Sequence, residues 1–123
     1  STLVTKQRVL KELFADAYQK MAAWSREEEL AFLHRVLPRY ADQATVLTLG
    51  AVTAEKLTDQ DRQDLLEAYP QLQLAKETLA QEAGFILSFG KVDASYLYRD
   101  LVDAVREEQS FHMAASIFKE EKN

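Results

Sequence analysis

Apolar side chains near the start of the chain recur at steps of three and four residues. This spacing predicts one amphipathic helix from about Leu3 to Trp24. A second helix is predicted from Ser25, because Ser25 and Glu28 have the spacing of a capping box. Pro38 lacks the backbone N–H that a helix requires, so we expect the second helix to bend or end there.

The middle of the chain carries shorter patterns. Segment 45–49 is apolar, β-branched and followed by a glycine, which predicts a strand. Thr58 is followed by acidic residues and predicts the N-cap of a helix over 58–69. Polar and apolar residues alternate over 71–75, which predicts a strand with one face in solvent. Segment 76–83 fits a loop or a further short strand.

The last third begins with the clearest strand pattern, at 85–89. Gly90 predicts a tight turn, after which 91–93 would return as a short antiparallel strand. Ser95 is the expected N-cap of a C-terminal helix. The apolar phase of that helix slips at about 107–110, which predicts a kink or a second short helix.

This order of elements predicts an α+β fold, in which N-terminal helices precede a small β-α-β-β-α head whose sheet packs on helices. At 123 residues and 47% hydrophobic composition, the chain has the size and core of one domain. Residues 1–24 would be the end of a projecting helix and residues 25–123 the globular head. Because the chain starts at Ser1 and enters a helical pattern at once, we expect it to be a fragment of a longer protein.

The charge balance argues against two classes of partner. Fifteen basic and 20 acidic residues give a net charge of −5, a surface that repels nucleic acid and anionic lipid. No apolar run approaches the roughly 18 residues needed to span a bilayer. The absence of cysteine leaves no disulfide framework, which suits a cytosolic protein.

Residues with catalytic potential are few. His34 and His112 lie on predicted helices without a metal-ligand partner one turn further on, and the three glycines form no phosphate-binding pattern. The acidic run 27–29 is interpreted as a solvated helix face with favourable charge near a helix N-terminus. Asp93 is interpreted as a helix-capping residue. We therefore expect no catalytic, cofactor-binding or metal site.

The order of motifs resembles the C-terminal head domain of the E-type peripheral-stalk subunit of V-type and A-type rotary ATPases. The matching elements are Gly84, Phe85-Ile86-Leu87, Gly90, Val92-Asp93, Arg106-Glu107 and Ile117-Phe118. The resemblance extends to most of the chain, including Lys6-Gln7-Arg8-Val9-Leu10, which is similar to the segment where the family's long helix enters the head. Two positions depart from the family pattern: Ala83 stands where a glycine often precedes Gly84, and Ala94 stands where an asparagine often follows Asp93.

The resemblance implies a non-catalytic stator subunit of a proton- or sodium-translocating ATPase. Such a subunit pairs with the G-type stalk subunit through a coiled coil. Its head holds the N-terminal region of the B-type subunit of the catalytic hexamer against the torque of the rotor. The protein would be cytoplasmic and reach the membrane only through the ATPase complex. An upstream coiled-coil helix, absent from this chain, would complete the stator protein.

Two apolar stripes are the predicted partner-binding residues: Leu3, Leu10, Phe14 and Tyr18 near the start, and Phe111, Ile117 and Phe118 near the end. Gly84, Gly90, Asp93 and Ser95 are the structural signature of the resemblance. Three alternatives remain open. One is a stator-like regulator of a type III secretion ATPase. Another is an unrelated small ligand-binding or enzymatic domain, which predicts a concave pocket with convergent polar groups. The third is an isolated head that binds and inhibits another ATPase.

Overall fold

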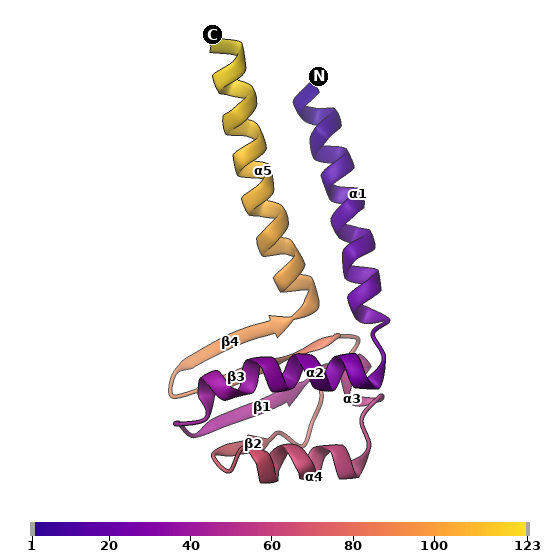
Figure 1. Ribbon diagram of the computed structural model, residues 1–123, viewed down its shortest axis with the longest axis vertical. Coiled ribbons are helices and arrows are strands. Elements are labelled where there is room, and N and C mark those ends of the chain that lie inside the picture. The colour runs from indigo at the N-terminus through magenta and orange to yellow at the C-terminus, as the bar shows by residue number, and fades with distance from the viewer. Residues whose placement is uncertain (1, 123) are drawn as a thin grey trace.

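Two long antiparallel helices stand on a small head that contains the sheet (Figure 1). The computed structural model describes residues 2–122. Helix α1 (Thr2–Ala22) leads into the head and helix α5 (Tyr98–Lys122) leaves it, so both ends of the chain lie at the far end of the helix pair. The predicted α+β class is confirmed.

Within the described residues, the head combines four strands with three α-helices and one 3₁₀ turn. In chain order these are α2 (Arg26–Val36), η1 (Leu37–Tyr40), β1 (Thr45–Leu49), α3 (Ala51–Ala54), α4 (Asp59–Ala68), β2 (Leu72–Leu74), β3 (Gly84–Phe89) and β4 (Val92–Leu97). The sheet has the order β2-β1-β3-β4, in which β1 and β2 are parallel and the other neighbours antiparallel. The predicted strands at 45–49, 71–75 and 85–89 are therefore confirmed, with ends adjusted by a residue or two.

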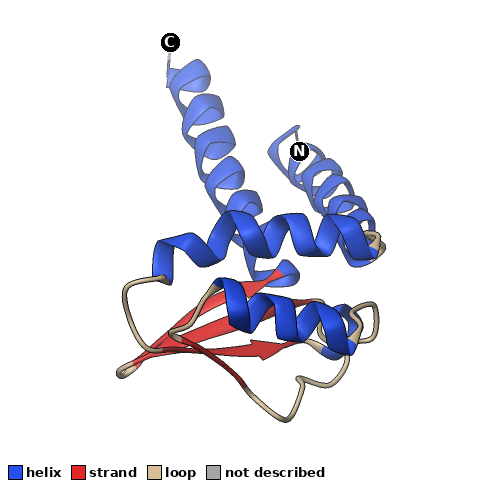
Figure 2. Ribbon diagram, turned by 60° about the horizontal axis from the view of Figure 1, so that its bottom comes forward, coloured by secondary structure: helices blue, strands red, loops and turns tan. Residues whose placement is uncertain are grey.

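The core lies between the sheet and the helices that cover one of its faces (Figure 2). Alternate residues of β1 and β3 point to that side, and Leu47, Phe85 and Leu87 are completely buried. Leu33 of α2 and Leu65 of α4 close the core from the helix side. The alternation of buried and half-buried residues in β1 is the signature of a sheet with one covered face.

The helix starts follow the local sequence. The Oγ of Ser25 accepts a hydrogen bond from the Glu28 backbone N–H at 3.1 Å, and Glu28 Oε1 accepts one from the Ser25 N–H at 3.0 Å. Thr58 and Asp61 form the same reciprocal pair at the start of α4. Helix α2 ends at Val36 and continues as the 3₁₀ turn that contains Pro38, as its sequence predicts.

Strand β4 is longer than predicted, and this displaces the start of the last helix. β4 pairs with β3 from Phe89↔Val92 to Gly84↔Leu97, so Asp93 and Ser95 are exposed strand residues. The prediction that these two residues cap the helix is wrong. The backbone of this segment continues to pair with β3 as far as Leu97, whose side chain is buried. The Ser95 hydroxyl instead donates to Asp100 Oδ2 at 2.6 Å, inside the first turn of α5.

Helix α5 runs without interruption from Tyr98 to Lys122, so the predicted kink or second helix is wrong. The positions on the side toward α1 are 102, 106, 110, 113 and 117, which continue at steps of three and four. Arg106 and Ser110 occupy two of these half-buried positions. The apolar pattern is therefore broken by polar residues on the inner side and not by a change in helical phase.

Two short features go beyond what the sequence pattern predicts. Helix α3 is a single turn after Gly50 that the apolar pattern does not indicate. Segment 76–83 is a loop, tied to the head by an isolated bridge between Leu79 and Gly50. Among the described residues, no helix combines the length and the apolar character needed to cross a membrane.

Gly84 and Gly90 offer a matched test of why glycine is needed. Gly84 has φ +103°, and a Cβ there would lie 2.4 Å from the carbonyl oxygen of Tyr96, whereas Gly90 has φ +57° with nothing within 4 Å. We expect Gly84→Ala to lower the free energy of unfolding by about 3 kcal/mol or more, and Gly90→Ala by about 1 kcal/mol. Urea unfolding measures both, and equal losses would contradict the steric argument.

Candidate interaction surface

The helix pair is the part of the molecule that extends beyond the head. Helix α1 has no fully buried residue between Thr2 and Ala22. The residues of α1 that face α5 are only half-buried, and we call them the inner stripe. The predicted residues Leu3, Leu10, Phe14 and Tyr18 all belong to this stripe. Phe14 and Tyr18 lie across from Arg99 and Val102 of α5, so part of their surface is already covered within the chain.

The C-terminal predicted residues are placed differently. Phe111 is 71% exposed and Phe118 is 66% exposed, and the two are separated by seven residues on the same side of α5. Ile117 is half-buried and lies with Leu3 beside the far end of α1. The structure thus divides the seven predicted residues into an inner set that helps to hold the helices together and two phenylalanines on the surface.

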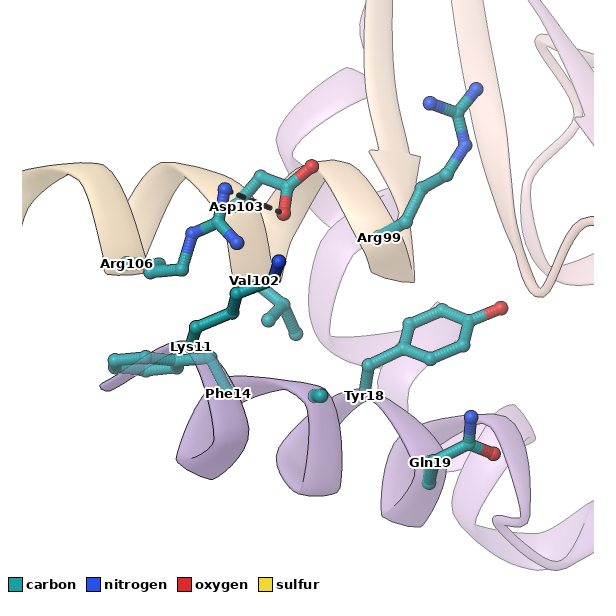
Figure 3. A pocket seen from close by; sticks show the side chains of 9 residues that line it. Lys11, Phe14, Tyr18, Gln19, Arg99, Val102, Asp103 and Arg106 are labelled. Atoms are coloured by element: carbon teal, nitrogen blue, oxygen red, sulfur yellow. Dashed lines mark ion pairs between the residues drawn. The ribbon is translucent and has the colours of Figure 1, made fainter. Parts of the chain in front are cut away.

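A shallow groove runs along one side of the helix pair (Figure 3). Its middle is apolar, with Phe14 of α1 facing Val102 of α5. Of its charged groups, Arg106 lies 4.0 Å from Asp103. Arg99 pairs with Glu82 outside the groove, and Lys11 forms no ion pair with the described residues. The groove brings together no pair of carboxylates and no nucleophile with a base among the residues that line it, so its chemistry suits contact with another side chain.

Lys56 fastens the C-terminal end of α1 to the head. Its ammonium group donates hydrogen bonds to the backbone oxygens of Ala22, at 2.9 Å, and Trp24, at 2.8 Å. The last carbonyls of a helix have no partner within the helix and carry partial negative charge. A lysine from the turn after α3 therefore satisfies the end of α1 and fixes its position.

Aromatic rings fill the joint between the helix pair and the head. Trp24 contacts Tyr98 edge-on, with ring centroids 5.2 Å apart, and contacts Phe32 at 5.7 Å. Phe32 also contacts Tyr98 at 5.8 Å. These three rings come from the connection that follows α1, from α2 and from the first residue of α5, so the joint couples both long helices to the head.

A buried carboxylate lies at the centre of this joint. Glu29 and Tyr98 have no exposed surface, and the Tyr98 hydroxyl donates to Glu29 Oε1 at 2.6 Å. Burial, together with this hydrogen bond, raises the pKa of the Tyr98 hydroxyl well above its usual range. Glu29 Oε2 has no hydrogen-bond partner among the described residues. The interpretation of 27–29 as a solvated face is therefore wrong for Glu29, because the third residue of the run turns into the core.

Arg26 connects the start of α2 to α4. Its Nε donates to Asp61 Oδ2 at 2.7 Å, and a second guanidinium nitrogen reaches Oδ1 of the same carboxylate. Asp61 is 5% exposed and also caps α4 through Thr58. The Arg26 hydrogen bond is the main reason that the pKa of the Asp61 carboxyl lies well below its usual range.

The two histidines lie on the surface, as predicted. His34 is exposed, and its Nδ1 lies 2.9 Å from the Tyr69 hydroxyl. His112 lies 3.8 Å from Glu108, one turn earlier on α5. Within residues 2–122, no three histidine or acidic side chains are grouped as a metal site would require.

No protein-family model, curated protein or solved structure matches this chain. The resemblance to the E-type stalk proteins therefore rests on the residues and their order alone.

Sequence reasoning missed the residues that make the joint. Lys56 lies between two helices in a polar context, and nothing in the pattern connects it to α1. The expected N-cap at Ser95 would put both Tyr96 and Tyr98 on the C-terminal helix, whereas the structure places Tyr96 in β4. The spacing of Glu29 from Leu33 and Val36 does place it on the buried side of α2, and this is the one signal that the sequence offers.

The buried bond between Glu29 and Tyr98 is tested by removing its two partners in turn. Tyr98→Phe leaves both Glu29 oxygens without a donor, and we expect a loss of about 1–3 kcal/mol in the free energy of unfolding. In that background Glu29→Met removes the orphaned carboxylate and should restore part of the loss. Chemical denaturation measures each variant. An unchanged stability in Tyr98→Phe would show that the bond contributes nothing.

The bond between Arg26 and Asp61 predicts a pH dependence. Because the pKa of folded Asp61 is lowered, the stabilisation is complete above the unfolded value of about 4 and is lost as the pH falls below it. The melting temperature of the wild type should exceed that of Arg26→Gln by a constant margin from about pH 7 to about pH 5, and the margin should shrink below about pH 4.

The control for this experiment is Arg35→Gln, which removes an arginine of α2 that forms no ion pair with the described residues. Its melting temperature should follow that of the wild type across the same pH range. A margin for Arg26→Gln that is unchanged in acid would contradict the assignment.

Proposed function

We propose that this chain is the head, with the adjoining helix, of an E-type peripheral-stalk protein of a V-type or A-type rotary ATPase. It catalyses no reaction and acts by holding the catalytic hexamer against rotor torque. It does so in the cytoplasm, as a part of the membrane-bound complex. The proposal joins the motif order around Gly84, Gly90 and Asp93 with a fold in which a long helix leaves a compact head.

The observation that carries the proposal is the fastening of α1 to the head. A stator helix transmits force only if its end is held at several points, because a single flexible connection would let the head turn. Lys56 binds the carbonyl of Ala22, the last residue of α1, and that of Trp24 just beyond it, and Trp24 packs on Tyr98 and Phe32. The bond between Arg26 and Asp61 follows directly at the start of α2.

The direction of α1 also supports a stalk role. Its N-terminal end lies at the far end of the helix pair, away from the sheet (Figure 1). A helix that continued upstream would extend away from the head, as a coiled coil with the G-type stalk protein requires. Phe111, at 71% exposed, lies on the same projecting part and supplies apolar surface to such a partner.

The groove between α1 and α5 supports the alternative function, a small ligand-binding domain, less well than it supports the stalk proposal. Arg99 is engaged by Glu82 at 2.8 Å, and Arg106 by Asp103 at 4.0 Å. Both arginines are thus paired with acidic side chains of the same chain, which leaves Lys11 as the one cation of the groove lining without an ion pair to the described residues. A site for an anionic ligand would instead offer convergent donors that lack such partners.

An association experiment tests the proposal directly. The chain is mixed with the purified G-type stalk protein and the N-terminal domain of the B-type protein from the same organism. The mass is followed by size-exclusion chromatography with light scattering, and we expect a stable complex of the three proteins. If neither partner binds, even with the upstream helix restored, the stator proposal is wrong and the secretion-type regulator becomes the next candidate to test.

The contribution of the surface phenylalanine is tested by Phe111→Glu. Because Phe111 is 71% exposed, we expect the melting temperature to stay the same while binding to the G-type stalk protein weakens by about tenfold or more. Val92→Glu is the matched control, since Val92 is a 51% exposed apolar residue at the hairpin end of β4. Equal binding by both variants would remove Phe111 from the interface.

A further inference from the structure

Strand β4 forms one edge of the sheet. In the order β2-β1-β3-β4 its strand neighbour is β3, and the helix pair rises beyond its other side (Figure 1). The opposite edge is β2, which has three residues and follows Pro70 closely, whereas β4 has six residues and no proline. A short edge beside a proline accepts a further strand poorly, and a longer edge without proline accepts one readily. The two edges therefore differ in their capacity to pair.

The backbone groups of β4 face β3 and the open side in turn. Phe89 and Val92 flank the two-residue turn of the hairpin, and such a flanking pair exchanges both of its hydrogen bonds. Hydrogen-bonded pairs alternate along an antiparallel ladder, so every second residue from Val92 onward bonds to β3. Asp93 and Ser95 therefore direct their backbone N–H and C=O groups away from the sheet.

Two hydrogen bonds at the end of the strand agree with this alternation. The Tyr98 N–H faces the β3 side and donates to the Ala83 carbonyl at 2.9 Å. The Leu97 N–H faces the open side, where it donates to the Ser95 hydroxyl oxygen at 3.3 Å. The chain thus closes the C-terminal end of its own edge. Within residues 2–122, no group outside the sheet pairs with the backbone of Asp93 or Ser95.

The covered side of this edge is apolar. Val92 is 51% exposed, which makes it the most exposed large apolar side chain from α2 to β4. Tyr96 stacks on Phe85 with ring centroids 5.3 Å apart, and its hydroxyl lies 2.7 Å from that of Tyr40. Tyr40 in turn contacts Phe89 at 5.4 Å. We call Val92, Tyr96 and Tyr40 the apolar shelf, since alternate side chains of an added strand would lie against them.

The opposite side of the edge is polar. Asp93 and Ser95 are exposed there, and the Ser95 hydroxyl is held by Asp100 at 2.6 Å. The charged residues that flank β4 have both signs: Lys91, Arg99, Glu82, Asp93 and Asp100. Charge therefore gives an occupant little preference on this side, and uncharged polar side chains fit it.

We propose that the open edge of β4 binds one extended segment of a partner protein, which adds a fifth strand to the sheet. The segment has no proline over at least about four residues, because its own N–H and C=O groups pair with those of Asp93 and Ser95. Its side chains alternate. Those against the apolar shelf are β-branched or aromatic, and those on the opposite side are polar and uncharged.

The position of α5 favours a single segment over a second copy of the chain. A second copy paired through β4 would bring its own sheet and helices into the space beyond this edge. Helix α5 leaves the end of β4 and rises into that same space (Figure 1). A four-residue segment is roughly 13 Å long and meets only the part of the edge before Leu97. The inference goes beyond the proposed function, because it holds for any protein that supplies such a segment.

Three designed peptides test whether the backbone makes the contact. Each has the six-residue length of β4, alternates valine with threonine and carries a lysine at both ends. One peptide is unmodified, one is N-methylated on its threonines and one on its valines. Binding of each fluorescent peptide is measured by anisotropy. We expect the unmodified peptide to bind and one methylated peptide to bind at least about tenfold more weakly.

The methylated peptide that loses affinity also gives the direction of the segment. In an antiparallel pair the threonine N–H groups face Asp93 and Ser95, and in a parallel pair the valine N–H groups do. Absence of binding by the unmodified peptide, or equal binding of all three peptides, would overturn the proposal.

The position of the site is tested with Asp93→Pro, which removes an N–H that faces the open side. We expect the unmodified peptide to bind this variant at least about tenfold more weakly. Asp93→Ala is the matched control, because it removes the carboxylate but keeps the N–H, and it should bind as the wild type does. Where Asp93→Pro lowers the melting temperature, the methylated peptides give the same test on the wild type.

The apolar shelf is tested with Val92→Glu, which should also weaken binding of the unmodified peptide. Leu66→Glu, at a 36% exposed leucine of α4, is its control and should have no effect. Equal losses in these two variants would overturn the proposal. Light scattering that shows a dimer of the chain, dissociated by Asp93→Pro, would also overturn it by assigning the edge to a second copy.

These outcomes are independent of the stator test. The peptides contain no ATPase sequence, so selective peptide binding without a complex with the G-type and B-type proteins would retain the β4 edge and reject the stator. A complex with those two proteins, together with equal binding of the three peptides, would retain the stator and reject the β4 edge.

Discussion

The structure depends on the buried contact between Glu29 and Tyr98. Tyr98 is the residue at which β4 becomes α5, and Glu29 lies on α2, which follows α1 after a short connection. One hydrogen bond of 2.6 Å therefore connects α2, the first helix of the head, with α5, the helix that leaves the head. Because both residues are fully buried, the bond holds the first residue of α5 against α2 away from solvent.

A buried carboxylate such as that of Glu29 is destabilising by itself, so its presence in the joint needs a structural reason. The desolvation of a charge is only partly offset by one hydrogen bond, and Glu29 Oε2 has no partner among the described residues. An apolar side chain at position 29 would fill the core without that penalty. The polar contact adds directionality that apolar packing lacks, which fits a joint that must hold two long helices at a defined angle.

The contact between α1 and α5 contains no complete apolar core. α1 has four basic and two acidic residues, whereas α5 has four basic and six acidic residues, so the pair is attractive in charge. Their inner stripes are half-buried, and large apolar side chains stay exposed on both sides. Anchoring at the head holds the pair in place although it has no complete core of its own.

Local structure follows from the sequence alone: the capping boxes at Ser25 and Thr58, the strand at 45–49 and the hairpin at Gly90 all arise from interactions within a few residues. The extension of β4 to Leu97 and the continuity of α5 do not follow from it, because strand pairing and the inner position of Arg106 are set by distant partners. The spacing of Glu29 places it on the buried side of α2, but its contact with Tyr98 is a product of the tertiary structure. Contacts between segments far apart in the chain depend on how α1 and α5 meet, and no local pattern encodes that meeting.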